Sequence, residues 1–438
     1  MGIRVRRMTG SSVAAVDASS GAGEMRTRGH EAAVALVRAM IAGRTPHALL
    51  ISGPPGVGKT TLALDLAAGL LCDDPDPAAR PCRACRACRL VDRGLHPDLH
   101  RLAPSGPADQ IRIGDRERPD PGTVRRLASD LVLLPVEGGA RVAILEHADR
   151  LTDDAQTALL KTLEEPPSGV TIVLCADDEE RLMPTVRSRC RRIRLGPVAV
   201  REIEAILGAM DLADPPLAAR LARIASGRPG AARTLALAPE ALAARDEISR
   251  MLLDLVGAGP AIRLAAARDL TGRAADLTRA LDRAGPTADG TTSAATLARP
   301  KARTRTAAAA ETPVEPADAS GTAGDDSSET DGAPVASASA AERRRGVATI
   351  IGLWRDLTRD LLLVRLGDER QVRDPGLLDD LRAAAEHFAP TGADPGADVA
   401  LAAFLGRLDE VGELVEANAR PEIALDSLLL GWPLAAPR

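Results

Sequence analysis

The segment Gly53-Pro-Pro-Gly-Val-Gly-Lys-Thr60 constrains the fold of this chain more than any other feature. It has the spacing G-x-x-x-x-G-K-[ST] and lies between a short apolar run, 47–52, and a stretch with leucines at helical spacing, 62–70. In this context the glycines let backbone N–H groups turn around phosphate oxygens, and the helix N-terminus adds partial positive charge. The sequence therefore predicts a phosphate-binding loop between a buried strand and a helix.

The loop predicts ATP with Mg²⁺ as its ligand. We expect Lys59 to reach the β- and γ-phosphates and the Thr60 hydroxyl to hold the metal. A loop that keeps this sequence but is seldom occupied is the alternative. The candidate nucleotide-binding residues are Gly53, Pro54, Pro55, Gly56, Val57, Gly58, Lys59, Thr60, Thr61 and, after a later strand, Glu146.

The acidic segment that should serve hydrolysis is altered. A second apolar run, 141–145, is followed by Glu146 and His147. Glu146 can coordinate Mg²⁺ through its bound waters, but the next position, where a water-polarising carboxylate belongs, is a histidine. Weakening the general base costs on the order of 10²–10⁴-fold in rate. We therefore expect the chain to hydrolyse ATP poorly or not at all.

Buried strands and helices alternate over the first half of the chain. A third apolar run, 170–174, resembles the other two, and helical patterns separate all three. This alternation is typical of a parallel sheet covered by helices. We predict an α/β domain over 29–197, followed by a small helical domain over 198–238.

The C-terminal part, 239–438, is expected to be a helical domain with an interruption. Residues 283–340 are dominated by Ala, Thr, Ser, Asp, Gly and Pro, which cannot bury enough surface to offset the ordering entropy. We predict a disordered insertion there and a disordered tail over 1–28. Two separate helical modules joined by a linker are the alternative.

Four of the six cysteines lie in the segment 72–88 and predict a structural zinc site in an insert after the first helix. Two C-x₂-C steps let four thiolates converge on a tetrahedral Zn²⁺ with no open position. An iron–sulfur cluster is the alternative, but the x₃-C-P continuation of that motif is missing. We interpret the nearby His96 and His100 as surface residues. The predicted ligands are Cys72, Cys82, Cys85 and Cys88.

Composition argues against several classes of protein. The chain of 438 residues has a net charge of −5 and only 1% aromatic residues. This charge disfavours a histone-like coat on nucleic acid, and so few aromatics disfavour binding of single strands by base stacking. Neither an apolar run of about 18 residues nor a secretory signal is present. We therefore expect a cytoplasmic protein with no membrane partner.

Two further motifs complete a family resemblance: Ala158-Leu-Leu-Lys-Thr-Leu-Glu-Glu-Pro-Pro167 and Thr185-Val-Arg-Ser-Arg-Cys190. With the phosphate loop and the cysteines after its helix, they resemble bacterial DNA polymerase III clamp-loader subunits of the AAA+ class. The resemblance is strong over about 29–240 and loose in the helical C-terminal part. It implies an α/β AAA+ P-loop parallel sheet with a helical lid and an all-α C-terminal collar domain.

Within this family the chain resembles the delta-prime subunit more than the ATP-hydrolysing gamma/tau motor. His147 lies where the motor carries a glutamate, and 175–178 contain no threonine where its sensor threonine would lie. Gly230 or Ala231 lies where a second-sensor arginine would contact the γ-phosphate. The resemblance therefore implies a subunit of the polymerase holoenzyme with little or no ATPase of its own. A gamma/tau-type motor is the alternative.

Arg189, in the Ser188-Arg-Cys190 motif, is the predicted catalytic residue. In the family's arrangement the corresponding arginine projects toward the nucleotide of a neighbouring subunit. The resemblance therefore implies an arginine finger that acts in trans. The alternative is that Arg189 pairs within the chain with Glu164 or Glu165.

The resemblance also implies partners: gamma/tau and delta subunits in a hetero-oligomer, together with a sliding clamp and primed DNA. A function of another class is a zinc-containing nucleic-acid-binding P-loop protein. It would need a basic surface, which the arginines around the cysteines could supply, namely Arg80, Arg83, Arg86 and Arg89. Solvated arginines in an Arg-rich composition are the simpler explanation.

Overall fold

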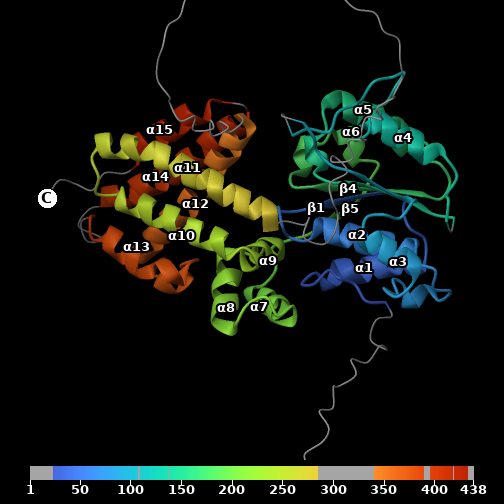
Figure 1. The fold of residues 1–438 in the computed structure, drawn as a ribbon, viewed down its shortest axis with the longest axis horizontal. Helices are drawn as coiled ribbons and strands as arrows, with labels where there is room; N and C mark the ends of the chain where they lie inside the picture. The colour runs from blue at the N-terminus through green and yellow to red at the C-terminus, as the bar shows by residue number, and fades with distance from the viewer. Residues whose placement is uncertain are drawn as a thin grey trace, which may run out of the picture.

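The computed structural model describes residues 23–106, 109–137, 139–284, 340–388, 395–417 and 419–432. An α/β part and a helical part lie at opposite ends of the molecule, and three short helices, α7 to α9, lie between them (Figure 1). The predicted class, α/β with a helical C-terminal region, is confirmed.

The α/β part is built on one parallel sheet of five strands in the order β2-β3-β4-β1-β5. The three central strands were predicted, and all of their residues are buried. The two edge strands were not predicted, because each buries only part of its residues. The strands are β1 Ala48–Ser52, β2 Leu99–Leu102, β3 Arg141–Leu145, β4 Val170–Ala176 and β5 Arg191–Arg194.

Helices cover both faces of this sheet (Figure 1). Because side chains alternate along a strand, Leu49 and Ile51 pack with the layer of α1 and α2, whereas Leu50 packs with the layer of α4 to α6. The first layer contains α1 Glu31–Ala42, α2 Lys59–Leu70 and α3 Arg86–Asp92. The second contains α4 Val124–Val132, α5 Asp153–Glu164 and α6 Pro184–Arg187.

Helix α5 shows how local sequence sets these boundaries. The Thr152 Oγ1 accepts a hydrogen bond from the Ala155 backbone N–H at 3.3 Å and caps the helix N-terminus. Asp153 and Asp154 add negative charge to the first turn. The helix ends at Glu164, shortly before Pro166, whose ring disfavours helical geometry in the preceding residue.

Part of the predicted tail is structured. The tail was predicted over 1–28, but residues 23–28 pack against the α/β part: Met25 is buried, and the Thr27 backbone N–H donates to Asp65 at 2.8 Å. Hydrogen bonds to the buried Asp65 carboxylate hold residues 23–28 in place, although the composition of this segment does not predict structure. Residues 1–22, and 285–339 of the predicted insertion, lie outside the described residues.

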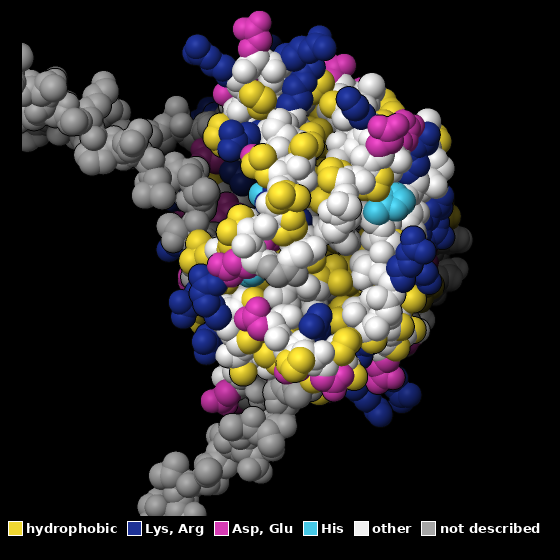
Figure 2. All heavy atoms as spheres, turned by 90° about the vertical axis from the view of Figure 1, so that its right-hand side faces the viewer, with side chains coloured by type: hydrophobic (Ala, Val, Ile, Leu, Met, Phe, Trp, Pro, Cys, Tyr) yellow, Lys and Arg dark blue, Asp and Glu magenta, His cyan; other side chains and the backbone are white. Residues whose placement is uncertain are grey.

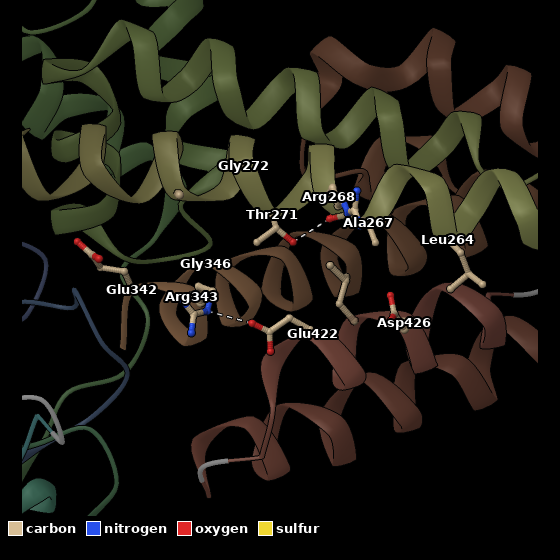
Figure 3. A pocket seen from close by; sticks show the side chains of 12 residues that line it. Leu264, Ala267, Arg268, Thr271, Gly272, Glu342, Arg343, Gly346, Glu422 and Asp426 are labelled. Atoms are coloured by element: carbon tan, nitrogen blue, oxygen red, sulfur yellow. Dashed lines mark hydrogen bonds and ion pairs between the residues drawn. The ribbon is translucent and has the colours of Figure 1, made fainter. Parts of the chain in front are cut away.

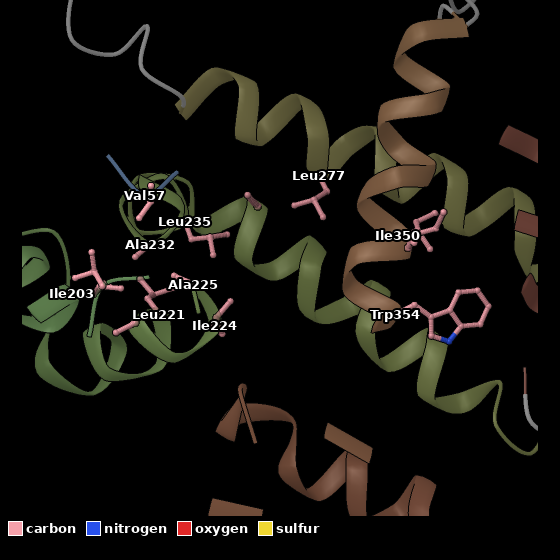
Figure 4. Close-up of a cluster of buried hydrophobic side chains, with 14 of the residues drawn as sticks. Val57, Ile203, Leu221, Ile224, Ala225, Ala232, Leu235, Leu277, Ile350 and Trp354 are labelled. Atoms are coloured by element: carbon pink, nitrogen blue, oxygen red, sulfur yellow. The ribbon is translucent and has the colours of Figure 1, made fainter. Parts of the chain in front are cut away.

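The helical part contains α10 to α15. Helices α11 and α12, from opposite sides of the undescribed segment, share one core in which Leu277, Ile350 and Trp354 are buried (Figure 4). This packing does not fit two separate helical modules. The short helices are α7 Val200–Ala209, α8 Pro215–Ile224 and α9 Pro229–Leu237. The others are α10 Pro239–Asp254, α11 Pro260–Ala284, α12 Ala340–Arg365, α13 Leu378–Ala385, α14 Pro395–Glu416 and α15 Pro421–Gly431.

All four aromatic residues of the chain are buried in the helical part. Trp354, Phe404 and Trp432 form an edge-to-face triangle with ring centroids 4.8 to 5.3 Å apart. The fourth, Phe388, carries the Arg365 guanidinium over its ring at 5.0 Å. None of these rings is available to stack on a base, in agreement with the exclusion made from composition.

A buried ion network joins the small helices to the C-terminal helices. Asp374 is only 2% exposed, and its carboxylate accepts hydrogen bonds from Arg220 Nε of α8 at 2.8 Å and from an Arg245 amino nitrogen of α10 at 2.7 Å. Two arginines from different elements therefore converge on one carboxylate.

We expect Asp374→Ala to lower the free energy of unfolding by about 3–5 kcal/mol, because it removes the buried carboxylate between Arg220 and Arg245 and leaves these arginines only Asp246 as a counter-ion. Urea denaturation followed by circular dichroism measures the loss. The matched control is Asp379→Ala, which removes a carboxylate that is 98% exposed and should change stability by less than about 0.5 kcal/mol. Equal effects of the two substitutions would contradict the importance of this network.

Candidate functional site

The predicted phosphate loop leaves the carboxyl end of β1 and enters α2, as the sequence requires. Gly53, Gly56 and Gly58 all have positive φ, at 152°, 77° and 111°. A Cβ on Gly53 would also lie 2.2 Å from the Leu195 carbonyl oxygen. The loop therefore needs glycine at Gly53 for both conformation and space.

Lys59, the first residue of α2, directs its ammonium group at oxygens of its own chain. Its Nζ donates to the carbonyls of Gly53 at 2.7 Å and Pro54 at 2.8 Å, and pairs with Asp177 Oδ1 at 2.6 Å. The two carbonyls thus engage two of the three N–H donors of the ammonium, and the Asp177 carboxylate balances its charge. The residue is only 7% exposed.

Sheet register explains why Asp177 lies beside Lys59. Strands β1 and β4 pair in parallel with Ser52 opposite Ala176, and the Gly53 N–H donates to the Ala176 carbonyl at 3.2 Å. The residue that follows each strand must therefore lie beside its counterpart, which brings Asp177 to the base of the loop.

Two further groups hold Asp177. Its backbone N–H donates to Asp149 Oδ1 at 2.8 Å, and its Oδ2 lies 3.2 Å from His147 Nδ1. Burial by itself would raise the pKa of Asp177, but hydrogen bonds from His147 and Lys59 outweigh it and lower this pKa to about 2. The hydrogen bond to Asp177 raises the pKa of His147 above its ordinary value. The carboxylate is therefore ionised at neutral pH.

Glu146, the predicted magnesium ligand, is also ion-paired. Its Oε1 accepts hydrogen bonds from Arg101 Nε at 2.8 Å and from an Arg101 amino nitrogen at 2.6 Å. Arg101 belongs to β2, which pairs with β3 so that Leu102 lies opposite Leu145. The edge strand that the sequence did not reveal thus supplies the counter-ion of Glu146.

The small helical domain rests directly on the phosphate loop. Val57 is buried beside Ala232 and Leu235 of α9 (Figure 4), and the Gly230 N–H donates to the Gly56 carbonyl at 3.0 Å. Gly230 is one of the two residues expected to replace a second-sensor arginine. In the structure, Gly230 contacts the phosphate loop through its backbone N–H.

Arg189 lies in the turn between α6 and β5, in the layer opposite α2. One of its amino nitrogens pairs with Glu164 Oε1 at 2.5 Å, and the other donates to the Thr185 carbonyl at 2.9 Å. The pairing with Glu164 was the alternative considered from the sequence. Both side chains are partly exposed, at 35% and 49%, so the pair is open to solvent.

The four predicted cysteine ligands come together beside α2 and α3. All four Sγ atoms lie within 4.8 Å of one another, with 4.0 Å between those of Cys72 and Cys85. Tetrahedral zinc at roughly 2.3 Å per bond places its sulfur ligands about 3.8 Å apart. All of these cysteines are free of disulfides. The cluster therefore fits a structural zinc site.

Backbone geometry supports the same assignment. The N–H groups of Cys82, Cys85 and Cys88 point at the sulfurs of Cys72, Cys82 and Cys85, at 3.5, 3.4 and 3.3 Å. Such contacts stabilise thiolates, the form that binds metal. Burial raises the pKa of Cys82, but the backbone N–H groups around it outweigh this and lower the pKa to about 7.

The arginines around the cysteines are largely engaged within the chain. Arg83 pairs with Asp65 and Asp92, and Arg86 pairs with Glu137 at 2.5 Å. Arg80 donates to the Asp74 carbonyl at 2.6 Å. On the face of the α/β part shown in Figure 2, basic side chains are dispersed and interleaved with acidic ones. These arginines therefore do not gather into a continuous basic surface on that face.

One expectation near the cysteines is wrong. His96 is 3% exposed rather than a surface residue, and its Nδ1 accepts a hydrogen bond from the Asp98 backbone N–H at 3.1 Å. The turn that leads into β2 buries it. His100, within β2, is half-buried.

Two other places in the described residues resemble ligand sites. His147, Asp149 and Asp177 have ligand atoms within 4.8 Å of one another, but contacts among themselves and with Lys59 account for this grouping. A cavity of about 570 Å³ lies between α11, α12 and α15 (Figure 3). The Arg343–Glu422 ion pair, at 2.9 Å, lies in its wall.

In the part of the chain that the structure describes, no helix combines the length and apolarity that crossing a bilayer requires.

The α/β part is similar to proteins of known families. Residues 29–199 match the family profile described as "DNA polymerase III, delta subunit". The chain is 36% identical over 201 residues to the DNA polymerase III subunit delta' of Escherichia coli K12, covering 46% of this chain and 57% of that protein. It is 35% identical over 217 residues to the tau subunit of the same organism, covering 48% and 32%.

The chain spans about half the length of the delta' relatives it matches. The delta' subunit of Pseudomonas aeruginosa, for example, is 38% identical over 144 residues, which cover 33% of this chain and 41% of that protein. A solved gamma subunit-related protein of Thermotoga maritima aligns over 90% of this chain and 96% of its own, at 15% identity and a TM-score of 0.39. A score this low supports no inference.

We expect the purified chain to contain one Zn²⁺ held by the four cysteines. Cys85→Ser should remove the metal and lower the melting temperature, because metal binding and folding of 72–88 are coupled. Elemental analysis by mass spectrometry measures the metal, and Cys190→Ser, which changes a cysteine outside the cluster, should retain it. Iron in place of zinc, or zinc retained by the Cys85 variant, would contradict the assignment.

Proposed function

We propose that this chain, which over residues 29–199 belongs to the DNA polymerase III delta-prime family related to gamma and tau, serves as a delta-prime-like subunit of a clamp loader. It acts as a stator and arginine-finger donor, with little or no ATPase of its own. The observation that carries this proposal is at the end of β3, where Glu146 is ion-paired to Arg101 and is followed by His147.

These two positions would have to serve hydrolysis. Phosphoryl transfer to water needs a metal that bridges the phosphates and a group that orients the attacking water. Thr60 and Glu146 are the residues that would hold the Mg²⁺ of a bound ATP, and Arg101 competes for Glu146. His147 is engaged with Asp177 and carries no fixed negative charge. The loop has the backbone conformation of a phosphate site, but among the described residues the site lacks a free acidic metal ligand and a group that orients the attacking water.

Arg189 is the residue proposed to act on a neighbouring subunit. Its ion pair with Glu164 is partly exposed, and exposed pairs contribute only about 0–1 kcal/mol. A phosphate group can therefore replace Glu164 at small cost. The planar guanidinium then stabilises charge on the transferring phosphoryl group.

The proposed partners follow from the family. The chain would assemble with gamma/tau-type motor subunits and a delta subunit in the cytoplasm, and within that complex it would help load a sliding clamp onto primed DNA. The C-terminal helices, with one continuous core, are the proposed collar for oligomerisation.

A gamma/tau-type motor is the competing proposal, favoured by the similarity to tau and by the intact glycines of the loop. A zinc-containing nucleic-acid-binding protein is less well supported, because Arg83 and Arg86 are paired within the chain.

We expect the isolated chain to hydrolyse ATP at or near background, because the metal ligand and the water-orienting group are both engaged elsewhere. A steady-state phosphate-release assay, with a gamma/tau subunit as the positive control, measures this. Turnover of several per second, within the ordinary range of enzymes, would favour the motor and end the stator proposal.

We expect Arg189→Ala to slow ATP turnover of the reconstituted complex without affecting assembly. At the nucleotide site of the neighbouring subunit that Arg189 faces, the rate of hydrolysis should fall on the order of 10³-fold. The turnover of the whole complex should therefore fall by the fraction that this one site contributes. Arg191→Ala, which removes an exposed arginine two residues away, is the matched control. Unchanged turnover in a fully assembled Arg189→Ala complex would show that this arginine has only the local pairing role.

A further inference from the structure

The contacts of Lys59 point to a role for an acidic residue that the family comparison does not assign. The Lys59 ammonium donates to two carbonyls and forms an ion pair with Asp177, the charged group among its three partners. We propose that Asp177 excludes nucleoside triphosphates from the phosphate loop by pairing with the Lys59 ammonium that a phosphoryl oxygen needs. This inference deepens the proposed function and rests on it for its biological meaning.

The charge of Asp177 opposes phosphate binding at Lys59. The Asp177 carboxylate is 2.6 Å from Lys59 Nζ and neutralises the one cation of the loop. With its pKa at about 2, it stays negative at any pH at which the protein works. A triphosphate that approached Lys59 would therefore have to displace a carboxylate and would meet its negative charge at the same time.

The position of Asp177 is fixed at two levels. The β4 register and the hydrogen bond from its backbone N–H to Asp149 hold its backbone, and the His147 ring contacts its carboxylate. His147 and Asp149 both belong to the 3-10 turn that follows β3, with His147 as its N-cap. A carboxylate with its backbone fixed and its second oxygen in contact with His147 is preorganised as the counter-ion of Lys59.

A different cause of exclusion is also present in the fold. The start of α9 rests on the loop through the Gly230–Gly56 hydrogen bond and the burial of Val57. If this contact alone closed the loop, the charge at Asp177 would not matter. The two causes therefore predict different behaviour when the carboxylate is removed.

The test is nucleotide affinity of the full-length chain, measured by isothermal titration calorimetry with ATP and Mg²⁺. We expect weak binding by the wild type and an affinity at least tenfold higher for Asp177→Ala and for the isosteric Asp177→Asn. Adding Lys59→Ala to Asp177→Ala should cancel the gain. Asp178→Asn is the matched control, because that neighbouring carboxylate is 54% exposed and does not contact Lys59.

Hydrolysis is not expected to accompany the gain, because Glu146 and His147 are unchanged. Equal affinities of the wild type and both Asp177 variants, with unchanged melting temperatures, would overturn the proposal and favour closure by α9. A gain that persists without Lys59 would overturn it as well. The proposed clamp-loader role is tested by different measurements, namely assembly and ATP turnover of the complex. Its failure can therefore be distinguished from a failure of the Asp177 proposal, which is measured as ATP affinity of the isolated chain.

Discussion

The parallel pairing of β1 with β4 is the constraint on which the whole site depends. Because Ser52 lies opposite Ala176, the phosphate loop and the residue after β4 are forced together at one edge of the sheet. The carboxyl edge of a parallel sheet is where ligands are usually bound. Here the same edge holds an ion pair between Lys59 and Asp177. In a loop with the geometry of a phosphate site, the lysine is thus paired with a carboxylate of the same chain.

The parallel sheet also determines where Glu146 and His147 lie. Strand β3 delivers Glu146 and His147 to this edge, and β2 delivers Arg101 beside them. Lys59, Glu146 and His147 each contact a charged partner that lies on, or directly after, a neighbouring strand. The pairing of these groups needs no change of fold, because the backbone that positions the residues is the same and only their partners differ.

Much of this architecture could be predicted from the sequence, and the limits have physical reasons. The central strands are buried on both faces and appear as continuous apolar runs, whereas β5 is the arginine-rich 191–194 with one buried residue. Cysteine spacing predicted the cluster, since four nearby thiols have few other ways to pack. The Lys59–Asp177 pair was missed because it joins distant segments. The signal was present, since Gly53 and Asp177 each follow an apolar run directly.

Many of the arginines form ion pairs or hydrogen bonds within the chain. Arg83, Arg101 and Arg220 all pair with carboxylates of the chain, and Arg263 is buried among backbone carbonyls. A count of basic residues therefore says little about a basic surface. In this chain arginine builds internal connections, including the network at Asp374 that joins the small helices to the C-terminal ones.

The aromatic triangle has a practical consequence. Both indoles of the chain lie in that one cluster and the chain contains no tyrosine, so its intrinsic fluorescence arises almost entirely from the C-terminal helices. The α/β part contributes no tryptophan or tyrosine emission. Any change in emission on mixing with another molecule would report an event felt at Trp354 or Trp432, in the helical part of the molecule (Figure 1).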